Sequence, residues 1–398
     1  MGAAPVNLAI ERPNDVLESF PSAAAMVRSR RPTRPVYCLY PRLLRGLARR
    51  FLEGFPGQVL FAVKANPEPR VLRQLHGAGV RHFDTASLEE IALVRNLLPD
   101  AQCYFMAPSK LVGAAAAAYR DYGVRHFVAD HDSEVARLLA VTGADATIHI
   151  RMKAHSKESI YELSSKFGVE EAEAAVLLRQ VAAAGRRPGL AFNVGSMCLH
   201  PDAYSRAIAA AGKVVADSGV EIASLDVGGG FPSPYPGLEV PPPEDFFAAI
   251  TQAAGAAGLP ADCVLLCEPG RALVAEGQSL VVQVILIKGD QVFLNDGIYG
   301  SLSEPGWSRR LVTFPVMAIR PEGALAAEHR DFAIAGPTCD TGDVLPVRFT
   351  LPADIRVGDW IEIGRVGAYS NAMRTHFNGF HPDDWANIDG QEARPPGV

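Results

Sequence analysis

The chain has 398 residues, of which 48% are hydrophobic and 21% are charged, and its formal net charge is −6. These proportions are typical of a globular protein with a substantial core, and the length allows two domains or one large barrel with an appendage. The negative balance lacks the basic footprint of a nucleic-acid-binding protein, so we expect no nucleic-acid partner.

The six cysteines are scattered and form no C-x-x-C pair. This pattern predicts free thiols in a reducing compartment and no metal site. No apolar run approaches ~18 residues, and the first residues include acidic side chains but no apolar segment typical of a signal peptide. We therefore expect a cytoplasmic protein that does not enter a membrane.

Residues 1–35 form a lead-in segment that ends in a basic, proline-containing stretch and could add a strand to a later β domain. Beyond it, short apolar segments alternate with alanine- and leucine-rich stretches of helical length. The apolar segments are Val59–Val63, His82–Ala86, Cys103–Met106, His126–Ala129, Thr147–Arg151, Leu190–Val194, Ile222–Val227 and Val264–Cys267. Eight such strands predict an α/β fold with a (β/α)8 barrel over residues 36–274, in preference to a doubly wound sheet.

After Arg271 the sequence becomes rich in β-forming segments that are separated by Gly, Asp and Pro turns. This change predicts a separate β domain over residues 275–398. The expected strands are Leu280–Ile287, Gln291–Leu294, Leu311–Ile319, Phe332–Ala335, Val344–Leu351 and Trp360–Ile363.

The apolar run Val59–Val63 ends abruptly on Lys64, and Pro67 prevents further strand pairing. A lysine at the carboxyl end of a buried strand lies where a barrel keeps its catalytic residues. One reaction of such an amine is Schiff-base formation with pyridoxal phosphate. This stretch by itself favours a lysine whose side chain simply reaches solvent. The residues at the other strand ends are needed to distinguish this alternative from a catalytic lysine.

Those strand ends offer a coherent set of groups. Gly228-Gly-Gly230 would let backbone N–H groups approach an anion closely, although a glycine triplet alone is more often a tight turn. Arg271 and Ser196 are reasonable phosphate partners. Glu268 could keep a pyridine nitrogen protonated, or it could be a rim carboxylate paired with Arg271.

Several motifs occur at these positions and in the last third of the chain. They are Phe61-Ala-Val-Lys-Ala-Asn66, Phe83-Asp-Thr-Ala-Ser87, Ser165-Lys-Phe-Gly168, Val194-Gly-Ser196, Asp226-Val-Gly-Gly-Gly-Phe-Pro232, Glu268-Pro-Gly-Arg271, Gly336-Pro-Thr-Cys-Asp340, and Gly367-Ala-Tyr369 with Phe377-Asn-Gly-Phe380. From about residue 36 to residue 381, the chain resembles the pyridoxal-phosphate-dependent ornithine/lysine/diaminopimelate decarboxylases, and most of all the ornithine decarboxylases. Members of this family have an alanine-racemase-like barrel and a β domain.

The resemblance implies that Lys64 forms the Schiff base with pyridoxal phosphate and that Glu268 pairs with the pyridine nitrogen. It implies that Asp84 and Arg151 support the site around the lysine and the ring. The residues that it assigns to the phosphate or its surroundings are Asn193, Ser196, Gly228, Gly229, Gly230, Gly270, Arg271 and Tyr369.

In this family two active sites form at the interface of a head-to-tail homodimer. The resemblance implies that Cys339 of one subunit protonates the carbanion in the other, and that Asp340 binds the distal amine of the substrate. Asp343, Phe377 and Glu304 are further substrate-site candidates, and Lys166 is expected near Asp343 at the interface. The alternatives are a buried, structural Cys339 and turn-forming roles for the two aspartates.

Two features depart from the family pattern. Asn193 stands where ornithine decarboxylases usually have a histidine that stacks on the cofactor ring, and an amide has less π surface. Asn295-Asp-Gly-Ile-Tyr-Gly300 is followed by a shortened, altered segment at 301–307, where Glu304 would have to replace the substrate carboxylate usual in the family.

Carboxylates around the substrate's distal end favour a cationic side chain over the second α-amino-acid head of diaminopimelate. We therefore predict decarboxylation of L-ornithine to putrescine for polyamine biosynthesis, with L-lysine to cadaverine close behind. Three alternatives stay open. They are a decarboxylase of a modified or carrier-linked amino acid in natural-product biosynthesis, a non-catalytic homologue that binds pyridoxal phosphate, and a racemase with the same barrel.

Overall fold

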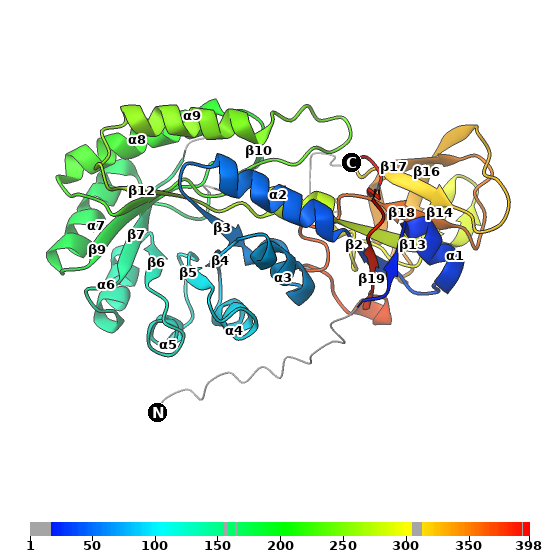
Figure 1. Cartoon of the computed structure of the whole chain (residues 1–398), viewed down its shortest axis with the longest axis horizontal. Coiled ribbons are helices and arrows are strands. Elements are labelled where there is room, and N and C mark those ends of the chain that lie inside the picture. The colour runs from blue at the N-terminus through cyan, green and yellow to red at the C-terminus, as the bar shows by residue number, and fades with distance from the viewer. Residues whose placement is uncertain (1–16, 155–157, 164, 305–312, 392) are drawn as a thin grey trace. The chain divides into compact units, whose positions relative to one another are not determined.

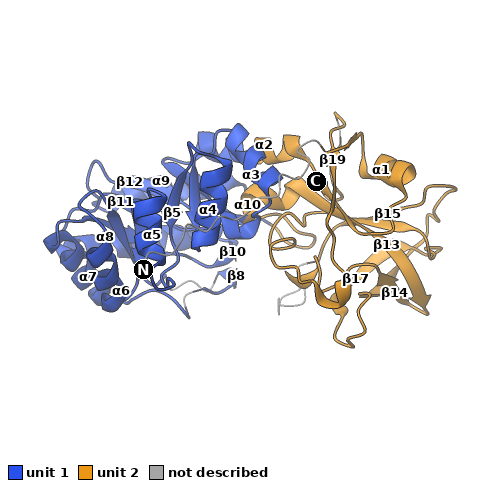
Figure 2. Cartoon of the chain, turned by 90° about the horizontal axis from the view of Figure 1, so that it is seen from below, with its two compact units in different colours: residues 1–11, 48–232, 240–270 blue, residues 12–47, 233–239, 271–398 orange. Residues whose placement is uncertain are grey.

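The structure is a computed structural model that describes residues 17–154, 158–163, 165–304, 313–391 and 393–398. The chain divides into two compact units (Figure 2). We call residues 48–232 and 240–270 the barrel unit, and residues 17–47, 233–239 and 271–398 the β unit. No helix among these described residues is long and apolar enough to span a membrane.

The barrel unit is built on a closed ring of eight parallel strands in the order β11-β12-β3-β4-β5-β6-β7-β9. The strands are β3 (Gln58–Ala62), β4 (His82–Thr85), β5 (Gln102–Phe105), β6 (His126–Ala129), β7 (Thr147–Arg151), β9 (Arg187–Ala191), β11 (Ser224–Asp226) and β12 (Val264–Cys267). Each strand overlaps one of the eight apolar segments of the sequence, which confirms the predicted (β/α)8 barrel.

Helices lie outside the strand ring (Figure 1), as expected for strands that are buried on both faces. Local signals define several helix starts: the Ser87 hydroxyl, for example, accepts a hydrogen bond from Glu90 N at 3.1 Å. The helices are α2 (Pro41–Gly54), α3 (Pro69–Gly77), α4 (Leu88–Leu97), α5 (Ala114–Asp121), α6 (Asp132–Val141), α7 (Glu171–Ala183), α8 (Asp202–Ser218) and α9 (Pro243–Ala256). A short antiparallel pair, β8 (Ser159–Tyr161) and β10 (Ser196–Cys198), completes the unit.

The β unit contains a nine-stranded sheet whose main path is β1-β19-β2-β13-β14-β16-β17, with β18 joining β13 to β15. Its elements are β1 (Ser19–Phe20), α1 (Ala23–Arg30), β2 (Val36–Leu39), α10 (Arg271–Val274), β13 (Gln278–Lys288), β14 (Gln291–Leu294), β15 (Val316–Ile319), β16 (His329–Ala335), β17 (Val344–Pro352), β18 (Trp360–Ile363) and β19 (Asp384–Ile388). Strand β15 covers only the end of the expected Leu311–Ile319 strand, and residues 311 and 312 lie outside the described part.

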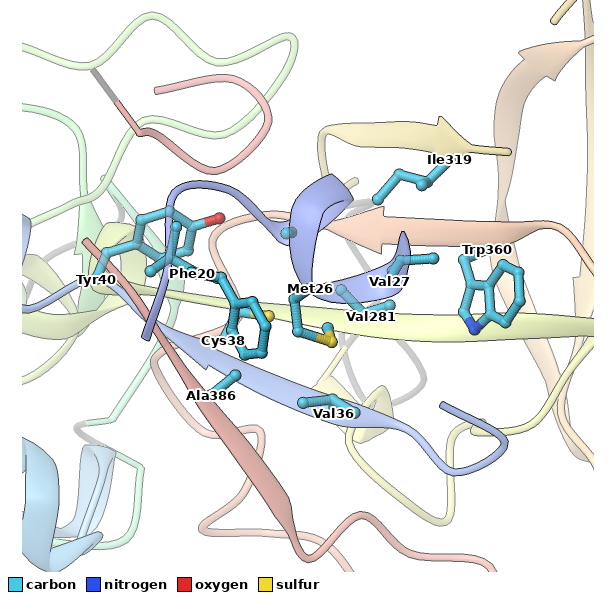
Figure 3. Close-up of a cluster of buried hydrophobic side chains, with 12 residues drawn as sticks. Phe20, Met26, Val27, Val36, Cys38, Tyr40, Val281, Ile319, Trp360 and Ala386 are labelled. Carbon is cyan, nitrogen blue, oxygen red and sulfur yellow. The ribbon is translucent and has the colours of Figure 1, made fainter. Parts of the chain in front are cut away.

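Both ends of the chain contribute to the core of the β unit. Strand β2 pairs with β13 and with β19, so Val36–Leu39, which the sequence analysis assigns to the start of the barrel, lies in the β sheet. Figure 3 shows the hydrophobic cluster that these pairings bury. Its members are Phe20, Ala23, Met26, Val27, Val36, Cys38, Tyr40, Val281, Ile319, Trp360, Ala386 and Ile388.

A row of aromatic and imidazole side chains crosses the amino-terminal side of the barrel interior. Tyr104 stacks on His126 with ring centroids 4.1 Å apart, and the His126 and His149 centroids are 5.8 Å apart. His149 Nε2 lies 2.8 Å from Ser224 Oγ. A Cβ at Gly189 would lie 2.4 Å from the His149 ring, so the glycine leaves the space that this imidazole fills.

We expect these histidines to make the barrel sensitive to acid. Burial lowers the pKa of His149 from 6.5 to about 4, so the native state keeps this ring neutral while the unfolded chain protonates it. The neutral His149 ring therefore costs no stability above pH 6.5. As the pH falls toward 4, the unfolded chain gains a proton that the native state does not bind, and the free energy of unfolding decreases by about 3 kcal/mol.

Chemical denaturation between pH 7 and pH 4 measures this effect. The variant His149→Gln should have a smaller fall in the free energy of unfolding across this range than the wild type. The exposed His329 provides the control, because His329→Gln should leave the pH dependence unchanged. An equal fall in wild type and His149→Gln would contradict the prediction.

Candidate active site

Lys64 lies just beyond β3, in the single helical turn Val63–Ala65. Its Nζ donates a hydrogen bond to Asp84 Oδ2 at 3.3 Å; the Asp84 side chain is 3% exposed, whereas that of Lys64 is 50% exposed. Gly270 packs on the same turn, since a Cβ there would lie 2.9 Å from Ala65 Cβ. The amine is thus anchored by a buried carboxylate and stays accessible to a ligand.

The loops that follow β3, β11 and β12 are joined by backbone hydrogen bonds. Glu268 N donates to Gly228 O at 2.8 Å, and Ala62 N donates to Pro269 O at 3.2 Å. These bonds hold Glu268 and the glycine triplet close to the turn that contains Lys64. Barrel closure therefore brings together groups that are about 200 residues apart in the sequence.

The glycine triplet after β11 can be formed only by glycines. Gly228 and Gly230 have φ values of 71° and 102°, a region that disfavours other residues. A Cβ on Gly228 would lie 2.3 Å from Phe192 O, and a Cβ on Gly230 would lie 2.3 Å from Gly195 O. Because side chains are excluded, the loop can present its backbone closely to an anion such as phosphate.

Asn193 lies next to the glycine loop. Its Oδ1 accepts a hydrogen bond from Gly195 N at 2.9 Å, which shapes the turn that leads to Ser196 at the start of β10. Its Nδ2 would lie 3.2 Å from a Cβ on Gly228. The amide thus shapes the turn before Ser196 and lies close to Gly228 of the glycine loop.

Carboxyl groups surround the lysine. Burial, followed by the charges of Asp226 and Asp84, raises the pKa of Glu268 well above its usual range, while Lys64 and Arg151 oppose the rise. Burial thus favours the protonated form of this carboxyl. A protonated carboxyl can donate a hydrogen bond to a pyridine nitrogen and share its proton with that nitrogen.

Asp226, at the end of β11, is a residue to which the sequence analysis assigned no role. It is fully buried, and its Oδ1 accepts a hydrogen bond from Gly228 N at 2.8 Å. Burial is the main cause that raises its pKa to about 7. Asp226 thus shapes the glycine loop and influences Glu268. An aspartate at a strand end, directly before a glycine loop, was the signal that could have identified it.

In the β unit, Arg271 and Glu304 form a buried, two-pronged ion pair. Arg271 Nη1 lies 3.0 Å from Glu304 Oε2, and Nη2 donates to Oε1. Nη1 also donates to the Tyr235 hydroxyl at 3.0 Å. The guanidinium carbon is 5.0 Å from the ring centroid of Tyr369. The structure therefore places Glu304, expected at the substrate, on the arginine expected at the phosphate.

A second group of β-unit residues gathers around Cys339. The thiol is exposed, which excludes the alternative of a small buried side chain, and its Sγ donates to Asn378 Oδ1 at 3.4 Å. The ring centroids of Tyr299 and Phe377 are 4.8 Å apart. Desolvation and a hydrogen bond to the exposed Asp340 raise the pKa of Tyr299. Three separate segments thus place a thiol, a carboxylate and aromatic rings together.

Asp343 differs from its neighbour Asp340. It is 2% exposed and accepts hydrogen bonds from Thr338 N at 3.1 Å, Thr338 Oγ1 at 2.7 Å and Ile298 N at 3.0 Å. These contacts are typical of a carboxylate that shapes a turn, which is the structural alternative named for it above.

Comparison with known proteins identifies the class. Residues 43–275 match the family described as "Pyridoxal-dependent decarboxylase, pyridoxal binding domain", and the chain belongs to this family. It is therefore a pyridoxal-phosphate-dependent amino-acid decarboxylase, as the resemblance predicted.

A lysine/ornithine decarboxylase of Selenomonas ruminantium is 34% identical over 337 residues, which cover 81% of each chain. Among solved structures, the arginine decarboxylase of Paramecium bursaria Chlorella virus bound to agmatine has a TM-score of 0.81 at 25% identity, with 91% of this chain and 98% of that chain covered. A lysine/ornithine decarboxylase from Vibrio vulnificus complexed with putrescine has a TM-score of 0.78 at 28% identity, with 92% and 97% covered.

The residues of the barrel unit fit pyridoxal phosphate. The glycine loop, which excludes side chains, suits its phosphate. The buried Glu268 carboxyl, whose pKa is raised, suits its ring nitrogen, and the accessible lysine suits its aldehyde.

We expect Asp226→Asn and Asp226→Ala to differ. The amide still accepts the Gly228 N–H but no longer raises the pKa of Glu268, so kcat/KM should fall about tenfold with little change in cofactor affinity. The alanine also loses the loop contact, so it should bind pyridoxal phosphate more weakly than the asparagine variant. Cofactor titration by absorbance and steady-state kinetics measure both quantities, and wild-type values for both variants would contradict the role assigned to Asp226.

Proposed function

We propose that this protein decarboxylates a basic L-amino acid, with L-ornithine to putrescine first and L-lysine to cadaverine second. The observation that carries the proposal is the exposed Asp340, which directly follows the exposed Cys339 in the chain and offers a carboxylate to a cationic side chain. The named relatives support it, because they are decarboxylases of lysine, ornithine and arginine. The product would enter polyamine biosynthesis in the cytoplasm.

Bound pyridoxal phosphate supplies an electron sink for the bond that breaks at the substrate's Cα. In our proposal Lys64 holds the cofactor and later moves protons, and Asp84 keeps its amine in place. Glu268 would hydrogen-bond to the ring nitrogen, and Arg151 would balance the surrounding carboxylates. The residues proposed for the phosphate and its surroundings are Asn193, Ser196, Gly228, Gly229, Gly230, Gly270, Arg271 and Tyr369.

Cys339 is proposed as the acid that returns a proton to Cα after carbon dioxide leaves. A thiol needs its proton for this step, and the Asn378 amide oxygen accepts the S–H without adding a charge. Asp340 binds the distal ammonium group of the substrate, and the 41% exposed Phe377 contributes an apolar wall. Asn378 is thus a positioning residue for the thiol.

We further propose a head-to-tail homodimer in which this group from one subunit completes the barrel site of the other. Its support is the exposure of the thiol, the carboxylate and the phenylalanine, which a second subunit would cover. The sequence predicts a lead-in to residue 35, a barrel over 36–274 and a β domain over 275–398. Because β2 pairs with β13 and β19, we propose that residues 36–47 and 271–274 belong to the β domain and not to the barrel.

The substrate is tested by carbon dioxide release from purified protein loaded with pyridoxal phosphate. L-Ornithine, L-lysine, L-arginine, meso-diaminopimelate and D-ornithine are offered separately, with Lys64→Ala as the blank. We expect the highest kcat/KM with L-ornithine and no release in the blank. Release from meso-diaminopimelate alone would overturn the proposed substrate class, and release from none of the five would indicate a modified amino acid.

The shared site is tested by mixing two inactive variants. Lys64→Ala and Cys339→Ala should each lose activity on their own. If each site uses Lys64 of one subunit and Cys339 of the other, half of randomly mixed dimers have one intact site, and about a quarter of the wild-type activity returns. No recovery, despite subunit exchange seen by native mass spectrometry, would contradict the shared site.

A further inference from the structure

Glu304 is a buried carboxylate in a segment that departs from the family pattern. Its side chain is 10% exposed and that of Arg271 is 4% exposed. Both carboxylate oxygens contact the two terminal nitrogens of the guanidinium. An arginine that is engaged in this way offers the same fork of N–H groups that would bind two oxygens of a phosphate.

The chain before Glu304 is well anchored. Asp296, which is fully buried, accepts hydrogen bonds from Gly297 N at 2.8 Å and Ser301 N at 3.2 Å. The Tyr37 hydroxyl lies 2.7 Å from Ser301 Oγ. Glu304 follows this turn by only three residues. The anchored backbone therefore helps to hold its side chain on Arg271.

The surroundings of the guanidinium suit a single anion. The rings of Tyr235 and Tyr369 have centroids 5.8 Å and 5.0 Å from its central carbon, and Arg271 itself is buried. Burying two anions beside one guanidinium costs more than burying one, because like charges repel strongly away from solvent. Glu304 occupies both terminal nitrogens of Arg271, so a phosphate that binds these two nitrogens has to displace it.

We propose that Glu304 is an internal competitor for the phosphate-binding arginine, so that it weakens the affinity for pyridoxal phosphate and does not contact the substrate. This inference rests on the proposed role of Arg271 as a phosphate ligand. In this proposal Glu304 has a role at the cofactor site and does not have to bind the distal amine of the substrate. Other phosphate-like anions would also compete with Glu304 for the Arg271 guanidinium, so their concentration should affect cofactor binding.

The test uses the variant Glu304→Gln, which keeps the shape of the side chain and removes its charge. Cofactor-free protein is titrated with pyridoxal phosphate by absorbance and, separately, with inorganic phosphate by thermal shift. We expect the variant to bind pyridoxal phosphate about tenfold more tightly than the wild type and to be stabilised by lower concentrations of inorganic phosphate. The KM for the amino-acid substrate should stay within about twofold of the wild-type value.

The matched control is Glu244→Gln, because Glu244 forms a two-pronged pair with Arg50 at 2.6 Å on the exposed surface. This variant should leave both titrations unchanged. Weaker cofactor binding by Glu304→Gln would overturn the proposal, since Glu304 would then orient Arg271 for the phosphate. A higher KM with unchanged cofactor affinity would also overturn it, because Glu304 would then contact the substrate.

A double variant, Arg271→Gln with Glu304→Gln, separates this inference from the assignment on which it rests. It removes both charges together, so no unpaired buried charge stays behind. We expect it to bind pyridoxal phosphate more weakly than Glu304→Gln. If it binds as tightly as Glu304→Gln, Arg271 is not a phosphate ligand and the proposed competition fails with it, whereas the proposed decarboxylation, tested by the substrate panel, is unaffected.

Discussion

The pairing of the first and last barrel strands is the constraint on which the site depends. Strand β12 pairs in parallel with β3, through Leu266 with Gln58 and Cys267 with Val59, and this pairing closes the ring. Strands β11, β12, β3 and β4 are consecutive neighbours, so Asp226, Glu268, Lys64 and Asp84 come from four adjacent strand ends. An open sheet of the same strands would leave the lysine and Glu268 at opposite edges.

The charges at these strand ends balance one another. Three buried carboxyls are costly to ionise together, and burial with the charges of Asp226 and Asp84 raises the pKa of Glu268. Lys64 and Arg151 offset the others. The lysine on Asp84, the glycine loop and a carboxyl with a raised pKa are groups that suit the aldehyde, the phosphate and the ring nitrogen of pyridoxal phosphate.

In the β unit the candidate site residues lie on segments that connect strands. Turns near Tyr299, Cys339 and Phe377 meet through ring packing and through the Cys339–Asn378 hydrogen bond. The buried Asp343 fixes one of these turns with three accepted hydrogen bonds, whereas the exposed Asp340 accepts a turn hydrogen bond from Gly342 N at 2.7 Å. Of the two aspartates in this turn, Asp343 is buried and structural, and Asp340 is exposed.

The sequence by itself determined the (β/α)8 barrel, the β-rich region after it, the family and the cofactor, because buried parallel strands leave apolar runs and the site motifs lie at their ends. It did not determine that Val36–Leu39 belongs to the β sheet, since a short strand has the same pattern in either unit.

Only the tertiary structure decided the roles that depend on neighbours. Asp226 and Glu304 have the same chemistry as any acidic residue in the printed sequence. Burial and contact with Gly228 distinguish the first, and the guanidinium of Arg271 distinguishes the second. The pKa of a carboxyl and the choice of its partner depend on distance and solvent exposure, which are set by contacts between residues far apart in the chain.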